Sequence, residues 1–210
     1  MTAQVSLSTM WARGHYDDLY EFSCDAASWG YTAIEANAYV TSFDMLERLA
    51  AGPLPLLSLH NPIPNEQSSF GIKSYDLNLA SLDEDERVEA VSFVKQSILN
   101  AARLGALAIV LHMGHVPIGK AMQRQLHDMW HDDMMGSEAY RELQWKIPAL
   151  RAETEKQHLD RALQTLRDVE PLARDSGVML GVETRHNIHE FPNIDEAVVM
   201  LDETDPDVVG

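Results

Sequence analysis

Short apolar runs alternate with longer amphipathic segments along this chain. Five short runs have the length and composition of β-strands, and they cover residues 4–9, 32–37, 54–60, 107–112 and 178–184. The third and fourth runs are apolar at nearly every position, which predicts strands buried on both faces between helices. The alternation of strands and helices predicts an α/β fold around a parallel sheet.

Amphipathic helices are predicted between these strands. The clearest one begins after Ser81, where Ser81 and Glu84 have the spacing of a capping box, and it ends at Gly105. A second long helix is predicted over residues 148–174, with its end near Gly177. Shorter helices are predicted over residues 16–29, 43–51 and 195–202.

An unusual segment follows the fourth predicted strand. Residues from about 116 to 147 are rich in Met, His and Asp, and they exceed an ordinary strand-to-helix connection in length. We expect a helical insertion there, within one domain that covers residues 1–210. At the carboxyl end of a barrel strand, such an insertion would serve as a lid or a subunit contact.

The number of strand and helix units decides between two α/β architectures. Residues 207–210 have the pattern of the first half of a sixth strand. A complete (β/α)8 barrel needs about 250 residues, so we expect the front part of such a barrel, with five βα units and the start of the sixth strand. The alternative is a smaller doubly wound sheet, but the glycine turn that binds phosphate in those folds is missing.

Composition narrows the possible partners and the compartment. Sixteen Lys and Arg against 33 Asp and Glu give a net charge of -17, which disfavours nucleic-acid and anionic membrane surfaces. Cys24 is the only cysteine, which excludes an intramolecular disulfide and a multi-cysteine zinc site. With no visible signal peptide and no long apolar span, the sequence predicts a cytoplasmic protein.

Polar residues occur where the apolar strands end. Glu35 lies in the second strand, His60 ends the third, His112 ends the fourth and is soon followed by His115, and Glu183 lies at the end of the fifth. Because the carboxyl ends of parallel strands meet at one face, we expect these side chains to lie close together.

This set of strand-end groups suits a divalent metal. Imidazole nitrogen and carboxylate oxygen bind zinc, manganese and related ions, and a metal compensates the lost hydration of such groups. Each residue alone also has a structural explanation. A strand-end histidine can be satisfied by hydrogen bonds, and a glutamate can pair with a nearby arginine.

These residues, in this order, resemble the signature of the xylose-isomerase-like TIM barrel superfamily. It includes sugar phosphate isomerases and epimerases, hydroxypyruvate isomerase, inosose dehydratase and endonuclease IV. The matching pieces are residues 34–35, 59–60, 110–114 and 180–183. The resemblance implies a (β/α)8 barrel, and the further ligands of the family pattern, on strands six to eight, would follow Gly210.

The resemblance also implies roles for individual residues. Glu183 matches a glutamate that binds the divalent metal (Mn, Zn, Mg or Co) and acts as acid or base. His60 and His112 match zinc ligands of the endonuclease-like members. Substrate-binding roles are implied for Glu35, His115, Arg185 and Asn187. Arg185 has two interpretations, an anion-binding group or the partner of Glu190 in a surface ion pair.

The function that this resemblance implies is a metal-dependent isomerase or epimerase. The substrate would be a small sugar, sugar phosphate, polyol or keto acid, and a proton would move through an enediolate. Relatives often form homo-oligomers. One alternative is a zinc phosphodiesterase similar to endonuclease IV, which the acidic charge disfavours. The other is a non-catalytic barrel that binds a sugar-like ligand.

Overall fold

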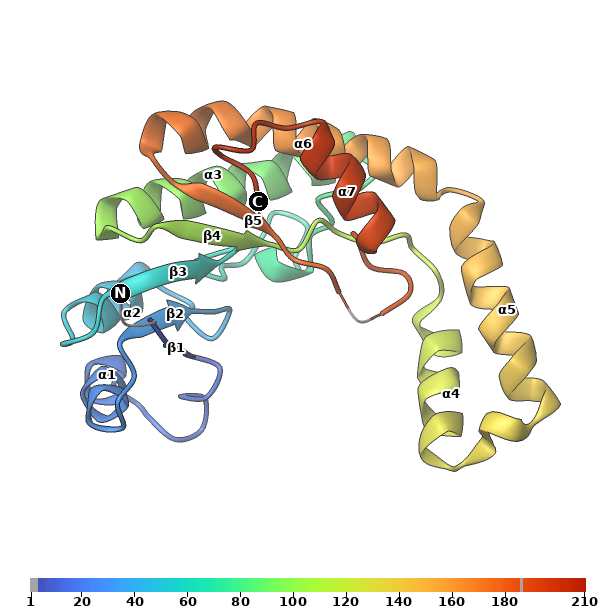
Figure 1. The fold of residues 1–210 in the computed structure, drawn as a ribbon, viewed down its shortest axis with the longest axis horizontal. Helices are drawn as coiled ribbons and strands as arrows, with labels where there is room; N and C mark the ends of the chain where they lie inside the picture. The colour runs from blue at the N-terminus through green and yellow to red at the C-terminus, as the bar shows by residue number, and fades with distance from the viewer. Residues whose placement is uncertain (1–3, 186) are drawn as a thin grey trace.

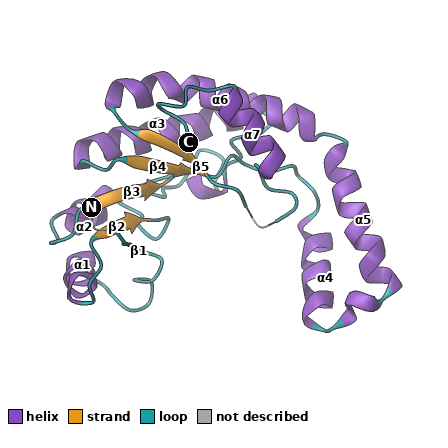
Figure 2. Cartoon of the chain, viewed as in Figure 1, coloured by secondary structure: helices purple, strands orange, loops and turns teal. Residues whose placement is uncertain are grey.

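The parallel sheet is the centre of the fold. The computed structural model describes residues 4–185 and 187–210. Within them, five parallel strands pair in chain order: β1 (Ser6–Ser8), β2 (Ala33–Ala36), β3 (Leu56–His60), β4 (Ala108–Leu111) and β5 (Met179–Val182). Helices connect successive strands, as parallel neighbours require (Figure 2). The predicted α/β fold with five βα units is confirmed.

The end of the chain extends this sheet by the start of one further strand. The backbone N–H of Leu180 donates to Val208 over 2.7 Å, and that of Gly210 donates to Leu180 over 3.0 Å. Leu180 and Val209 form a parallel bridge. Pairing therefore continues past β5 in sequence order, as in a barrel, whereas a doubly wound sheet reverses its strand order.

Helices cover one face of the sheet. Helices α3 (Glu84–Leu104) and α6 (Glu155–Ser176) pack on strands β3 to β5 (Figure 1). The strand residues that face them are fully buried, and they include Leu59, Ile109 and Leu180. Smaller helices follow β1, β2 and β5: α1 (Leu19–Ser28), α2 (Phe43–Ala50) and α7 (Ile194–Asp202).

The opposite face departs from the prediction that both faces lie between helices. There Ser58, Val110 and Gly181 are only partly buried. In the described part of the chain this face has no covering helix layer (Figure 1). The physical reason is the barrel geometry, in which the inner face turns toward the barrel interior and only the outer face needs helices. The prediction of a second helical layer was wrong.

Two predicted helix boundaries also differ from the structure. Helix α3 is capped by Asp83, whose side chain accepts from the backbone of Asp85 and Glu86, while Ser81 donates to the Glu86 side chain instead. The predicted helix 148–174 is two helices, α5 (Glu138–Ala152) and α6, separated at Thr154 by a non-helical φ of -131°. Among the described residues, no helix combines the length and the apolar character needed to cross a membrane.

Helices α4 (Lys120–His131) and α5 form a hairpin that stands away from the sheet (Figure 1). A small apolar cluster of Met129, Tyr140 and Leu143 holds the two helices together. At the base of the hairpin, Arg151 forms a buried ion pair with Glu196 of α7 over 2.7 Å. Because breaking a buried pair leaves an uncompensated charge, this contact fixes where the hairpin joins the fold.

Candidate metal site

The strand register places the candidate residues on the inner face of the sheet. His60 pairs with Val110, and Val110 pairs with Gly181. His112 and Glu183 lie two residues beyond Val110 and Gly181. Because side chains alternate along a strand, all three point to the same side at the carboxyl end. Residues separated by as many as 123 positions therefore converge.

The three side chains meet at one carboxylate oxygen. Oε2 of Glu183 lies 3.1 Å from Nε2 of His60 and 2.8 Å from Nε2 of His112. The two imidazole rings are nearly perpendicular, with centroids 4.4 Å apart. The histidine side chains are 9% and 16% exposed and the glutamate side chain 45%. The site is thus closed behind the imidazoles and open beside the carboxylate.

Arg185 competes for the same imidazole nitrogen. Its Nη1 lies 3.0 Å from Nε2 of His112, which also faces Glu183. A guanidinium only donates and a carboxylate only accepts, so one tautomer of His112 cannot satisfy both contacts. A cation between the imidazoles and the carboxylate would be bound by lone pairs of both Nε2 atoms and of Oε2. Arg185 would then have to leave His112 and keep only its contact with Glu190.

The charge state of the site follows from its surroundings. Burial, together with the charges of His60 and Arg185, lowers the pKa of His112 to about 4, and Glu183 only partly opposes this shift. Burial raises the pKa of the Glu183 carboxyl, but His112 and His60 outweigh it, so the net pKa is below its usual value. At neutral pH, His112 is therefore a neutral imidazole beside an anionic carboxylate.

The groups behind the imidazoles differ between the two histidines. The Tyr75 hydroxyl lies 3.4 Å from Nδ1 of His112, the nitrogen at which a metal-bound histidine usually has a hydrogen-bond partner that orients its ring. Nδ1 of His60 is buried, and no other described residue hydrogen-bonds to it. Of the two imidazoles, only that of His112 therefore has a polar side chain next to its Nδ1 atom.

The donor set fits a divalent metal. The three donor atoms lie within 4.8 Å of one another, and among the described residues this is the group that could hold a metal ion. Two histidines, one glutamate and an open position form a ligand set of catalytic zinc sites. The unsupported Nδ1 of His60 is the feature that departs from a complete metal site.

Glu35 lies apart from these three residues. It aligns with Ser58, and the Ser58 hydroxyl donates to its carboxylate over 3.0 Å. Ser58 precedes His60 by two residues, so Glu35 sits about 6 to 7 Å deeper along the inner face. The structure places Glu35 on the predicted face and does not join it to the group of His60, His112 and Glu183.

His115 belongs to a loop that is fixed by its backbone. Asn78 accepts from the His115 N–H over 3.0 Å and donates to the His115 carbonyl over 2.9 Å. Gly114 allows this approach, since its φ is +102° and an added Cβ would lie 2.7 Å from the Ala80 nitrogen. The ring of His115 packs against His189, with centroids 5.7 Å apart.

Arg185 and Asn187 both bind Glu190. Nη2 of Arg185 lies 3.3 Å from Oε1 of Glu190, and the Asn187 side chain donates to Oε2 over 2.8 Å. Of the two interpretations of Arg185, the ion pair is present. Its other contact, with His112, makes it part of the metal-site surroundings.

Sequence reasoning missed Tyr75 and Asn78, because these residues come from segments between strands that the strand-end pattern does not cover. Tyr75 also borders a cleft of about 500 Å³ near the ends of β1 to β3. Its polar lining includes Arg13, Asn37 and Asn65. No spacing in the sequence links these three residues, since three different loops carry them.

Comparison with known sequences identifies one matching family. The family described as xylose isomerase-like TIM barrel matches residues 25–210. No curated protein sequence matches the chain significantly.

Solved structures share the fold at low sequence identity. A D-tagatose 3-epimerase-like protein has a TM-score of 0.64 at 18% identity, covering 99% of this chain and 63% of its own. D-psicose 3-epimerase from Clostridium cellulolyticum H10 has 0.62 at 16% identity, with coverages of 99% and 62%. The 3-keto-D-glucoside 4-epimerase YcjR from E. coli has 0.60 at 12% identity, with 98% and 65%. The chain thus spans somewhat less than two thirds of the structures it resembles.

Proposed function

We propose, given that the chain belongs to the xylose isomerase-like TIM barrel family, that it carries the metal site of a sugar isomerase or epimerase. The observation that supports this function best is the convergence of His60, His112 and Glu183 on one point of the inner face. The metal is a divalent cation, and the substrate is a small carbohydrate with a carbonyl beside a C–H bond.

The two carboxylate oxygens of Glu183 have different roles in this proposal. Oε2 faces both imidazoles and is the ligand oxygen. Oε1 makes no hydrogen bond within the described part of the chain, so it remains to take the proton from the carbon beside the carbonyl. A bound divalent cation supplies polarisation of that carbonyl, which makes the neighbouring C–H bond more acidic.

The surrounding residues position the substrate. The cleft of about 500 Å³ beside Tyr75 offers amide groups from Asn37 and Asn65 and the guanidinium of Arg13. Such groups hydrogen-bond sugar hydroxyls. The solved structures of similar fold include D-tagatose and D-psicose 3-epimerase-type proteins, which makes ketohexoses the first substrates to test.

Solvent exchange tests the proton transfer directly. Metal-free protein is incubated in D2O with D-tagatose or D-psicose, with and without Mn²⁺, Co²⁺ or Zn²⁺, and NMR follows loss of the C–H signal beside the carbonyl. We expect metal-dependent exchange that EDTA abolishes. Glu183→Gln should lower its rate by about 10² to 10⁴, the usual contribution of a general base.

A matched substitution controls for unspecific effects. Glu203→Gln makes the same chemical change in an exposed ion pair with Arg167 and should leave exchange unchanged. Exchange that persists in Glu183→Gln would contradict the proposal. Metal binding without exchange would favour a sugar-binding barrel, and zinc-dependent cleavage of DNA at abasic sites would favour the phosphodiesterase.

A further inference from the structure

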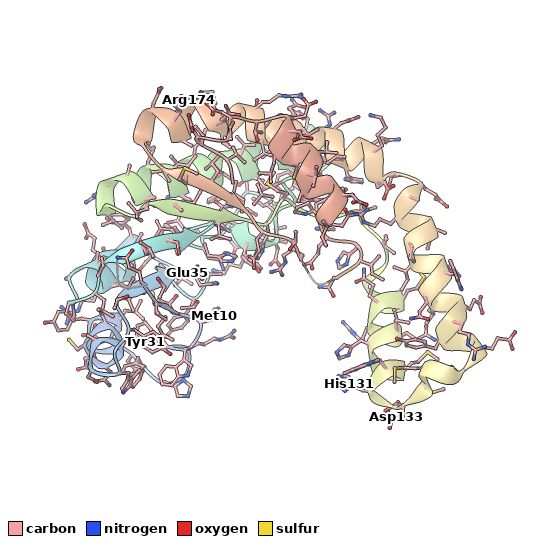
Figure 3. The ribbon with its side chains drawn as sticks, viewed as in Figure 1. Met10, Tyr31, Glu35, His131, Asp133 and Arg174 are labelled. Atoms are coloured by element: carbon pink, nitrogen blue, oxygen red, sulfur yellow. The ribbon has the colours of Figure 1, made fainter. Side chains whose placement is uncertain are left out.

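A second pair of histidines lies on the α4–α5 hairpin, outside the site described above. His127 and His131 are four residues apart on α4 and therefore share one helix face. Their Nε2 atoms lie 3.2 Å apart, and their ring centroids 4.4 Å. Figure 3 shows His131 on the side of α4 that faces the rest of the molecule.

The separation of the two nitrogens matches a chelate. Two imidazole nitrogens bound to one tetrahedral zinc ion at about 2.0 to 2.1 Å lie about 3.3 to 3.4 Å apart. Histidines spaced by four residues on a helix are a recurrent zinc-binding arrangement. A single hydrogen bond between the two rings also fits 3.2 Å, so a binding experiment must distinguish the two.

Charged and aromatic side chains surround the two rings. Oδ1 of Asp128 lies 3.8 Å from Nδ1 of His127, too far for a hydrogen bond, and adds negative charge beside the pair. Trp130 packs edge-on against the His131 ring, with centroids 4.9 Å apart. The two Nε2 atoms therefore already lie at nearly the separation that one shared ion needs.

The electrostatic surroundings favour a cation. Asp128, Asp132 and Asp133 lie on or next to the end of α4, in a protein with a net charge of -17. The His127 side chain is 67% exposed, so an ion can reach the pair without opening the fold. His127 also lines a cleft of about 220 Å³, and Ile188, which follows β5, is another of its lining residues.

We propose that His127 and His131 form a second metal site, which takes a zinc-class transition-metal ion with water in the remaining positions. Nitrogen donors select zinc, nickel or copper over magnesium and calcium, which prefer oxygen. This site is separate from the group of His60, His112 and Glu183, and its occupancy does not depend on the proposed catalytic function.

Calorimetric titration of the metal-stripped full chain with ZnCl2 tests this site. The double variant His60→Gln, His112→Gln removes the strand-end ligands, and it should still bind one zinc ion. Adding His127→Gln or His131→Gln to it should weaken zinc binding at least about tenfold. Loss of a group that only hydrogen-bonds to a metal ligand already costs about that much, and loss of a ligand itself costs more. Excess MgCl2 should not displace the ion.

Two further variants in the same background show that the pair is responsible. His15→Gln changes an exposed histidine that stacks on Trp11, and it should leave zinc affinity unchanged. Gln123→His combined with His131→Gln rebuilds a four-residue spacing with His127 one turn earlier, and it should restore binding. The proposal is overturned if the strand-end double variant binds no zinc, or if His127→Gln leaves its zinc affinity unchanged while circular dichroism shows an intact fold.

Discussion

The molecule has two pairs of neighbouring histidines, one largely buried at the strand ends and one on the surface of a helix. His60 and His112 extend from neighbouring strands, are largely buried, and share a carboxylate oxygen of Glu183. His127 and His131 extend from one helix, and the His127 side chain is 67% exposed. In both places imidazole Nε2 atoms lie about 3 Å from their nearest polar neighbour.

The difference lies in how each arrangement is held. Helical periodicity alone brings His127 and His131 together, so that pair needs only α4 to be folded. His60, His112 and Glu183 meet only when the whole β3–β4–β5 register forms. A buried, long-range site can desolvate a substrate and shift pKa values, whereas an exposed local site can only bind an ion. We therefore propose catalytic chemistry together with metal binding for the first site, and metal binding alone for the second.

The largest expected effect separates the two sites. The double variant His60→Gln, His112→Gln should weaken zinc binding at the strand ends by at least about 100-fold, because direct ligands are lost. His127→Gln with His131→Gln should leave that site intact. Zinc titrations of both variants measure this, and an equal loss in both would show that the sites are not independent.

The next effect is a pH dependence of stability that we expect from His112. The unfolded chain protonates His112 near its ordinary pKa of about 6.5, while the folded chain does so at a pKa of about 4. Lowering the pH between these values therefore favours the unfolded state, by on the order of 3 kcal/mol, and above pH 6.5 this group has no effect.

Urea unfolding of the metal-free protein at pH 7 and pH 4.5 measures this contribution. His112→Asn removes the titrating group, so its free energy of unfolding should fall less between the two pH values. The interpretation fails if the wild-type protein and the variant lose the same amount.

Gly114 connects the two regions, since it lies between His112 and α4. Gly114→Ala places a Cβ at a φ of +102° and against Ala80, which should lower the free energy of unfolding by roughly 1 to 3 kcal/mol. Gly136→Ala is the matched control, because nothing lies within 4 Å of its added Cβ. Urea unfolding compares the two, and equal stabilities would contradict the close packing at Gly114.

The smallest effect concerns the charge beside the buried pair. Arg185→Gln removes a positive charge next to His112 and should raise its pKa, by less than burial lowers it, because burial is the largest cause of the shift. An NMR titration of the His112 ring measures this change. Arg48→Gln, in an exposed pair with Asp18, is the control. A pKa of His112 that does not rise would show that the contact with Arg185 is weak.

The sequence predicted the strands and the convergence of His60, His112 and Glu183 because both follow from rules of short range. Apolar runs locate strands, and alternation fixes which residues share a face. It could not predict the break at Thr154, which divides the predicted helix between α5 and α6, because tertiary packing decides where helices end. Nor could it place Tyr75 or decide between the two interpretations of Arg185, since loop conformations bring those side chains to the site.

The central claim is that His60, His112 and Glu183 bind one divalent cation. A crystal of the protein soaked in ZnCl2, with diffraction recorded on both sides of the zinc absorption edge, tests it most directly. We expect an anomalous peak within about 2.0 to 2.2 Å of both Nε2 atoms and of Oε2 of Glu183, with Arg185 turned toward Glu190. Zinc found only at His127 and His131, with Arg185 still against His112, would contradict the claim.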